Sequence, residues 1–339
     1  MSPAPLDHKE ILQNKRGGMN LLEVKNLRMC YQTSQGLIKA VDGVSFELRK
    51  GEALGLVGES GCGKSTIALS IMRLLPPNGR LLGGEILFAD EDLLTKDEEE
   101  MRKIRGRRIS LIFQAALNAL NPVHRVGDQI IEAIQAHERI DKKEALKRVE
   151  ELYRLVGLNP GMVNSYPHQY SGGMKQRAII ALALSCNPEL LIADEPTTAL
   201  DVIIQDQIIK EILKLQKEFN LTLIYISHDI SLIAETCSSI GVMYAGKLVE
   251  YAPTIALFQS PLHPYTKGLL ASYPSVKGPR RKIAPIPGEI PNLLHPPSGC
   301  RFHPRCPRAE EICGKEEPKY RRIKEDHYIA CHRVNNLTP

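Results

Sequence analysis

The sequence lacks several features that would assign it to a specialised class of protein. No apolar run reaches the roughly 18 residues that a membrane-spanning helix needs, because the best candidate, 178–193, is interrupted by Asn187, Pro188 and Glu189. Residues 1–18 lack the apolar core of a secretion signal, so we expect a polar tail and a cytoplasmic protein. No internal repeat is visible, which argues against a fusion of two similar halves.

The composition that is present is typical of a folded chain with an uneven charge. The 339 residues are 43% hydrophobic and 24% charged, which favours a large core and about two domains. Residues 261–339 carry 14 Lys or Arg and 7 Asp or Glu, whereas residues 1–260 are slightly acidic. Thirteen of the 23 prolines lie in the same C-terminal stretch. We therefore expect a boundary near Ser260 and a basic, proline-rich domain over 261–339.

Four of the eight cysteines are clustered in that C-terminal stretch. Their spacing is C-x5-C-x6-C-x17-C, at Cys300, Cys306, Cys313 and Cys331. Disulfides are disfavoured in the cytoplasm, so clustered thiols indicate a metal or cluster site. Zinc sites usually have tight cysteine pairs, whereas an iron–sulfur cube accommodates wider loops. The spacing therefore favours a structural [4Fe–4S] cluster, with Zn²⁺ and unligated thiols as the alternatives.

Short apolar runs alternate with amphipathic helical patterns along residues 19–260. Dense apolar runs predict strands that are covered on both faces of a parallel sheet, at 53–57, 109–113, 190–193 and 221–226. Alternating runs predict an antiparallel edge, at 22–29 and 44–48. The helical patterns are at 66–75, 128–136, 142–155 and 202–219. Strand-like runs are absent between Asn121 and Gln176, so we expect an inserted helical subdomain at about 116–178.

One segment has the pattern of a phosphate-binding loop. It lies between the run 53–57 and a predicted helix, fits G-x4-G-K-[ST], and consists of Gly58, Glu59, Ser60, Gly61, Cys62, Gly63, Lys64 and Ser65, followed by Thr66. Glycines let backbone N–H groups close around phosphates at a helix N-terminus. We expect Lys64 to contact the β- and γ-phosphates of ATP and Ser65 to ligate Mg²⁺. Cys62 lies beside Lys64, a setting that can favour the thiolate, although it is more often a tolerated loop residue.

Two acids end the apolar run 190–193. Asp194 and Glu195 follow that predicted strand directly. Burying carboxylates at a strand end is costly unless a metal ion or a reacting water uses them. We therefore expect Asp194 to support Mg²⁺ and Glu195 to act as general base on the attacking water.

A further motif makes the sequence resemble an ABC transporter ATP-binding subunit. The segment Ser171-Gly172-Gly173-Met174-Lys175-Gln176-Arg177 lies just before the strand that carries the two acids. The resemblance covers residues 21 to about 255 and rests on ordered motifs: the phosphate loop, Gln114, Ser171-Gly172-Gly173, Asp194-Glu195, Leu200-Asp201 and His228. Departures from the family pattern are modest, at Tyr170, Met174 and Ala115-Ala116.

This resemblance implies a fold and a set of roles. The fold is α/β: a P-loop (RecA-like) core with an antiparallel edge subdomain and an inserted helical subdomain in a nucleotide-binding domain over 19–260, plus a small irregular cysteine-containing C-terminal domain. In the family, the signature of one subunit closes on nucleotide bound to another, so Ser171, Gly172 and Gly173 would contact the γ-phosphate. The resemblance also implies that Gln114 is a Mg²⁺ ligand that senses the metal and the attacking water. It implies that His228 acts as a switch and that Tyr31 stacks on the adenine.

The C-terminal sequence narrows the resemblance. Three segments, 263–267, 287–291 and 300–306, are similar to the C-terminal region of oligopeptide and dipeptide importer ATPases, and nickel importers share much of it. The resemblance implies a peripheral motor on the cytoplasmic face of the membrane. Its partners would be two integral membrane permeases, a second ATP-binding subunit, identical or related, and, indirectly, an extracytoplasmic substrate-binding protein.

Two other functions stay open from the sequence. One is nickel import, because substrate choice lies in the permease and the binding protein. The other is a soluble ABC ATPase that acts on nucleic acid, for which the basic tail would supply phosphate contacts. A single cassette with a short helical insert argues against that second alternative, so we expect no nucleic-acid partner.

Overall fold

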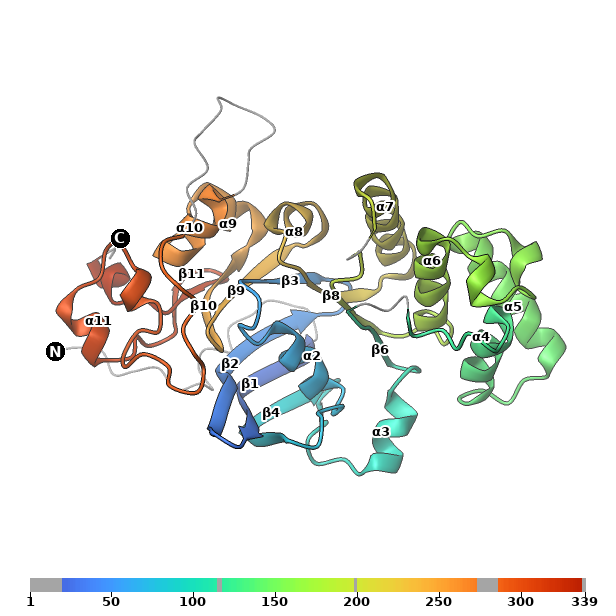
Figure 1. The fold of residues 1–339 in the computed structure, drawn as a ribbon, viewed down its shortest axis with the longest axis horizontal. Helices are drawn as coiled ribbons and strands as arrows, with labels where there is room; N and C mark the ends of the chain where they lie inside the picture. The colour runs from blue at the N-terminus through green and yellow to red at the C-terminus, as the bar shows by residue number, and fades with distance from the viewer. Residues whose placement is uncertain (1–19, 115–117, 198–199, 273–285, 337–339) are drawn as a thin grey trace.

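The computed structural model describes residues 20–114, 118–197, 200–272 and 286–336, and two β-sheets form its centre (Figure 1). The first sheet is antiparallel, has the order β2-β1-β4-β5, and consists of β1 (Asn20–Thr33), β2 (Gly36–Arg49), β4 (Gly79–Phe88) and β5 (Glu91–Asp92). The second sheet has the order β11-β12-β10-β9-β3-β8-β7-β6. Its strands are β3 (Ala53–Val57), β6 (Ile109–Ile112), β7 (Leu190–Asp194), β8 (Thr222–Ile226), β9 (Ser239–Tyr244), β10 (Lys247–Pro253), β11 (Arg321–Lys324) and β12 (His327–Ile329).

Helices connect the strands of the two sheets. They are α2 (Lys64–Ile71), α3 (Glu98–Ile104), α4 (Val126–Gln135), α5 (Lys142–Leu155), α6 (Gly172–Ala183), α7 (Val202–Phe219), α8 (Ile230–Thr236), α9 (Thr254–Gln259), α10 (Pro264–Ala271) and α11 (Glu311–Lys315). Short 3₁₀ turns lie at Pro160–Met162, Pro167–Gln169, His303–Arg305 and His332–Asn336. None of the helices within the described ranges is long and apolar enough to cross a membrane.

Strand β3 shows how the two faces of the second sheet are covered. All five of its residues are buried, and it pairs in parallel with both β8 and β9. Because side chains alternate along a strand, Leu54 and Leu56 pack into the core between the two sheets, together with α2. Ala53 and Val57 pack into the other core, which includes the helical subdomain. The prediction of parallel strands covered on both faces is therefore confirmed.

The helices α4, α5 and α6 pack together at one end of the molecule (Figure 1). Helix α5 has the predicted bounds and buries Ala145, Val149 and Leu152 on one face. Its N-terminus is capped by Asp141, whose carboxylate accepts a hydrogen bond from Glu144 N at 2.7 Å. Amphipathic spacing and a cap residue are sufficient to form this helix once its apolar face is covered.

Residues beyond 260 share the main sheet, a feature that their composition did not predict. Strand β12 pairs antiparallel with β10, with Glu250 opposite Ile329 and Tyr251 opposite Tyr328. The C-terminal residues form the end of the molecule opposite the helical subdomain (Figure 1). The proline-rich stretch therefore adds two strands to one edge of the main sheet, of which β12 is buried.

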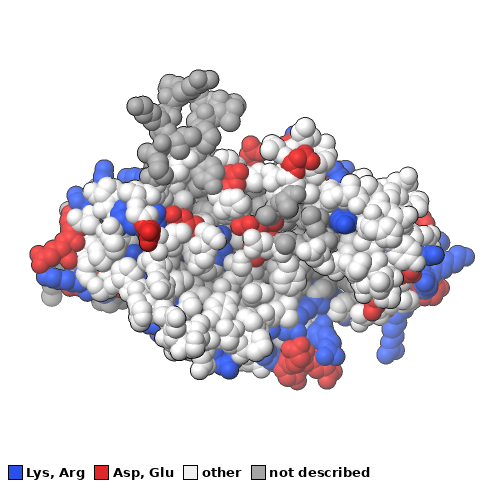
Figure 2. Space-filling view, viewed as in Figure 1, with Lys and Arg blue, Asp and Glu red and all other residues white. Residues whose placement is uncertain are grey.

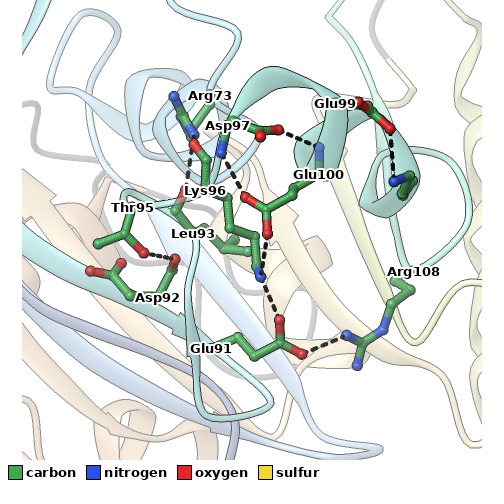
Figure 3. Close-up of polar contacts among 11 residues, drawn as sticks. Arg73, Glu91, Asp92, Leu93, Thr95, Lys96, Asp97, Glu99, Glu100 and Arg108 are labelled. Atoms are coloured by element: carbon green, nitrogen blue, oxygen red, sulfur yellow. Dashed lines mark hydrogen bonds and ion pairs between the residues drawn. The ribbon is translucent and has the colours of Figure 1, made fainter.

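Polar contacts cap α3 and join Glu91 to Arg108 (Figure 3). Asp97 and Glu100 form a reciprocal capping box at the N-terminus of α3, with both hydrogen bonds at 2.8 Å. Arg108 lies directly before β6 and pairs with Glu91 at 3.7 Å and with Glu189 at 2.6 Å. Because Glu189 directly precedes β7, Arg108 holds the starts of β6 and β7 together.

Candidate nucleotide-binding and hydrolysis site

The loop after β3 packs so closely on its neighbours that two of its positions require glycine. Gly58 and Gly63 have φ values of 151° and 106°, which side chains rarely adopt. A Cβ at Gly58 would lie 2.2 Å from Met243 O, and one at Gly63 would lie 2.1 Å from Ala40 O. The loop therefore follows a tight path between β2 and β9 before α2 begins at Lys64.

Lys64 is folded back onto this loop. Its side chain is buried, and Nζ donates hydrogen bonds to Gly58 O at 2.7 Å and Glu59 O at 3.2 Å. The ammonium group therefore lies inside the loop, where phosphates would replace carbonyl oxygens as its partners.

Cys62 is almost fully buried, and burial raises the pKa of its thiol although Lys64 opposes the rise. This environment disfavours the thiolate and supports the interpretation preferred from the sequence, a tolerated loop residue.

Asp194, at the end of β7, has the environment of a metal ligand. Burial raises the pKa of its carboxyl group, and a hydrogen bond from Ser65 partly opposes that rise. Its Oδ1 is buried and has no hydrogen-bond partner among the described residues. Buried polar atoms normally have partners, and Mg²⁺ binds carboxylate and hydroxyl oxygens. The pair Asp194 and Ser65 therefore fits Mg²⁺.

Glu195 lies between Gln114 and His228. Gln114 Nε2 donates to Glu195 Oε2 at 3.0 Å, and His228 Nδ1 lies 3.2 Å from Glu195 Oε1. Glu195 has a left-handed backbone, with φ of 47°, and its N–H donates to Ile226 O at 2.9 Å. The three side chains follow β6, β7 and β8, which are adjacent in the sheet. The carboxyl ends of neighbouring parallel strands thus bring together residues that are far apart in sequence.

Tyr31 and the signature segment lie on different sides of this arrangement. The Tyr31 hydroxyl is 3.1 Å from Thr66 Oγ1, so β1 contacts the start of α2. Ser171 caps α6 by accepting a hydrogen bond from Met174 N at 3.3 Å. Helix α6 lies beside α7 and away from α2 (Figure 1). The structure of one chain therefore does not bring Ser171, Gly172 and Gly173 to the phosphate loop.

Two residues beyond 260 contact the phosphate loop and were missed in the sequence. The Tyr265 hydroxyl accepts a hydrogen bond from Glu59 N at 3.0 Å. Arg305 pairs with the Glu59 carboxylate at 2.7 and 3.0 Å. Nothing in the spacing of the phosphate-loop motif signals partners that are more than 200 residues away.

The four C-terminal cysteines are near one another but are not arranged as a metal site. Burial, with smaller contributions from nearby Cys313, Cys331 and Cys306, raises the pKa of Cys300 to about 11. Cys300 N donates to Cys313 O at 2.8 Å. Within the described ranges, no group of three or more His, Cys, Asp or Glu side chains is placed to hold a metal ion. As placed, the thiols do not fit a metal, so we derive no step from one.

Two family models match the chain in order. The ABC transporter model matches residues 41–198, which include the phosphate loop, Gln114, Ser171, Asp194 and Glu195. The model of the oligopeptide/dipeptide transporter C-terminal region matches residues 249–313, which include Tyr265, Arg305 and three of the clustered cysteines.

Similar proteins cover nearly the whole chain. A dipeptide transport ATP-binding protein, DppD, of Caldanaerobacter subterraneus subsp. tengcongensis is 48% identical over 94% of this chain and 98% of its own. The oligopeptide transport ATP-binding protein OppD of Bacillus subtilis is 46% identical over 91% of this chain and 87% of its own. The solved dimer of the ATP-binding cassette MJ0796 with ADP and Pi is 28% identical, has a TM-score of 0.62, and matches 69% of this chain and 98% of its own. The chain therefore belongs to the family of ABC transporter ATP-binding subunits, in the branch that carries the oligopeptide/dipeptide transporter C-terminal region.

Proposed function

We propose that the chain is the ATP-hydrolysing motor subunit of an ABC importer that takes up dipeptides or oligopeptides. The observation that carries this proposal is the position of Glu195 between Gln114 and His228. Glu195 follows β7, and only β8 separates β7 from β3, the strand that leads into the phosphate loop. The peptide substrate is supported by the C-terminal region, which matches that of oligopeptide and dipeptide transporters.

Each residue at the site has a role that follows from its chemistry. Lys64 and the N–H groups of the loop bind the β- and γ-phosphates, while Ser65 and Asp194 hold Mg²⁺, which when bound neutralises phosphate charge. Glu195 accepts a proton from the attacking water, since its carboxylate is held by two hydrogen-bonding neighbours. Gln114 and His228 orient Glu195 and the water. Tyr31 stacks on the adenine, and its hydroxyl is anchored to Thr66.

We propose that the site is completed by a second subunit, identical or related. The backbone N–H groups of Gly172 and Gly173 begin α6, and Ser171 and Gly172 are exposed. A helix N-terminus with free N–H groups favours an anion such as the γ-phosphate. One chain does not supply this contact to its own phosphate loop, so the signature of a partner supplies it in a head-to-tail dimer.

The helical subdomain transmits the closure of this dimer to membrane permeases. Phe113, directly after β6, is 44% exposed and lines a hollow of about 220 Å³ with His137 of the helical subdomain and Met72 of the core. Gln114 follows Phe113, so a permease segment seated in this hollow would contact the residue next to the hydrolytic site. We therefore propose that the subunit is a peripheral protein at the cytoplasmic face of the membrane.

We also propose that Cys300, Cys306, Cys313 and Cys331 bind a structural [4Fe–4S] cluster, with Zn²⁺ as the alternative. This proposal rests on the cysteine spacing C-x5-C-x6-C-x17-C. As described, no three of these side chains are placed to hold one metal ion, so the thiols would have to move to bind a cluster. Anaerobically purified protein should be brown, contain iron and sulfide, and lose both in the C306S/C313S variant. Stoichiometric zinc in a colourless protein would contradict the cluster and favour the alternative.

Mass spectrometry of proteins that co-purify with this chain from detergent-solubilised membranes tests the proposed function. We expect two permeases and, if the ATPase pair is mixed, a related ATP-binding subunit. A nickel-specific binding protein or permease would favour nickel import. Salt-dependent binding to DNA without any membrane partner would favour the nucleic-acid alternative.

On the face shown in Figure 2, Lys and Arg are interspersed with Asp and Glu, so that face has no continuous basic stripe for a nucleic acid.

A further inference from the structure

The first turn of the phosphate loop is held from outside by residues of the C-terminal region. The Tyr265 hydroxyl accepts a hydrogen bond from the backbone N–H of Glu59 at 3.0 Å. The two carboxylate oxygens of Glu59 accept hydrogen bonds from Arg305 Nη1 and Nη2, at 2.7 and 3.0 Å. Both the main chain and the side chain of one loop residue are therefore fixed by segments far away in sequence.

Hydrogen bonds from every N–H group of the Arg305 guanidinium hold this side chain in one position. Beyond the two bonds to Glu59, Nε donates to Pro287 O at 2.8 Å, Nη1 to the Tyr244 hydroxyl at 3.4 Å, and Nη2 to Ile286 O at 3.3 Å. An arginine side chain has five N–H donors in a planar fork, and these five contacts use them all. Its side chain is only 5% exposed, so the pair with Glu59 is largely shielded from water.

Aromatic rings pack around Tyr265 and Arg305, which we call the clamp residues. Tyr265 packs against Tyr244 of β9 with ring centroids 4.6 Å apart, and Phe302 lies 5.3 Å from Tyr265 and 5.1 Å from Tyr244. All three rings are buried. Close-packed aromatic groups are rigid. This packing therefore restricts the positions of Tyr265 and Arg305.

Tyr265 and Arg305 bind Glu59, and Lys64 contacts the same part of the main chain. Lys64 Nζ is hydrogen-bonded to Gly58 O and Glu59 O, the carbonyls on either side of the Glu59 N–H and Cα. A shift of Glu59 would therefore move both the carbonyls that hold Lys64 and the start of the turn that presents N–H groups to phosphate. We propose that Arg305 and Tyr265 are positioning residues for nucleotide binding, through which the C-terminal region sets the affinity of the phosphate loop for ATP. This inference rests on the proposed nucleotide site.

The test is the dissociation constant of Mg-ATP, measured by titration calorimetry in a Glu195→Gln background that blocks turnover. We expect Arg305→Ala to weaken ATP binding about tenfold or more, the size seen when outer partners of a binding site are removed. Arg305→Lys should be intermediate, because a lysine has three donors on one nitrogen in place of the fork. Tyr265→Phe, which removes a single oxygen, should weaken binding less than Arg305→Ala does.

Arg301→Ala is the matched control. Arg301 is a second buried arginine of the C-terminal region, and it binds Asp42 and Ala245 O without contacting Glu59. We expect it to lower the unfolding temperature while ATP affinity stays within about twofold. A double-mutant cycle separates direct positioning from general loosening: in a Glu59→Ala background, Arg305→Ala should cause no further loss of affinity.

Three outcomes would overturn the inference: unchanged affinity in Arg305→Ala, equal weakening by Arg301→Ala, or a full effect of Arg305→Ala in the Glu59→Ala background. Lys64→Ala separates this failure from failure of the proposed site. If Lys64→Ala abolishes ATP binding and Arg305→Ala leaves it intact, the site stands and the clamp has no such role. If Lys64→Ala binds ATP normally, the nucleotide site itself is wrongly assigned.

Discussion

Glu195 shows how a single residue is prepared for its chemistry by its neighbours. Its backbone is left-handed and bonded to Ile226 O, and its side chain contacts Gln114 and His228. A non-glycine residue in this conformation is uncommon and often marks a functional position. The carboxylate therefore points in one direction instead of sampling several.

We predict that Glu195→Gln binds Mg-ATP but hydrolyses it about 10² to 10⁴ times more slowly, because the amide keeps the shape and loses the proton acceptor. Steady-state phosphate release measures the rate, and calorimetry measures the binding. Glu218→Gln, the same change at the exposed end of α7, should leave both unchanged. Equal turnover in Glu195→Gln and the unmodified protein would reject the assignment of Glu195 as the base.

At the scale of elements, local patterns predicted those parts of the fold that depend on local sequence. Helices α5 and α7 have the predicted bounds, and Asp201 caps α7, with Ile204 N donating to it at 3.0 Å. Strands β9 to β12 were missed. β9 with β10 and β11 with β12 form local hairpins that the sequence analysis overlooked. The pairing of Tyr251 in β10 with Tyr328 in β12 joins residues distant in sequence, so neither segment alone could predict it.

In the candidate site, too, some residues were predictable from local sequence and others were not. The phosphate-loop motif and the Asp194-Glu195 pair were recognisable because their chemistry lies in neighbouring residues. The contacts of Gln114 and His228 with Glu195 required the order of the strands, and the Arg305–Glu59 pair joins residues 246 positions apart. The sequence therefore predicted the motif residues themselves, but it did not predict the side chains that hold them in position.

We predict that Asp141→Ala lowers the free energy of unfolding by about 1 kcal/mol, the usual cost of losing an N-cap. Asp141 accepts a hydrogen bond from Glu144 N at the start of α5, in the helical subdomain. Asp141→Asn keeps an acceptor there and should stay within a few tenths of a kcal/mol of the unmodified protein. Urea unfolding followed by circular dichroism measures both. Equal losses in the two variants would show that charge, not the cap, is responsible.

The buried polar groups between β10, β12 and α10 predict a pH dependence of stability. Burial lowers the pKa of His263 to about 4, with the nearby Glu250 opposing it, and His263 Nδ1 accepts a hydrogen bond from Tyr265 N at 3.0 Å. Hydrogen bonds from His327, Thr266, Leu262 N and His263 N outweigh burial and hold the pKa of Glu250 below its usual value. The folded state therefore binds fewer protons than the unfolded state in acid, so stability falls as pH falls.

For His263 this loss begins near pH 6.5, where the unfolded side chain takes up its proton, and continues to about pH 4. Between pH 7 and pH 5 the unmodified protein should lose about 2 kcal/mol more unfolding free energy than His263→Asn, which keeps an N-cap acceptor without titrating. Urea titrations at the two pH values measure the difference. Parallel losses in both proteins would mean that His263 titrates alike in the folded and unfolded states.

At the scale of the whole molecule, the phosphate loop and the signature segment lie apart in one chain (Figure 1). In the proposed head-to-tail dimer, the phosphate loop of each chain would face the signature segment of the other. ATP would then hold the dimer together through its negative phosphates, and hydrolysis would release it. We therefore expect isolated subunits to be largely monomeric and to associate only when bound ATP persists.

The most direct test of the composite site is the molar mass of Glu195→Gln by size-exclusion chromatography with light scattering, with and without Mg-ATP. The account predicts a monomer without nucleotide and a dimer with Mg-ATP. The double variant Lys64→Ala/Glu195→Gln, which cannot hold the phosphates, should stay monomeric in both conditions. The same molar mass for Glu195→Gln with and without Mg-ATP, whether monomer or dimer, would contradict an ATP-dependent composite site.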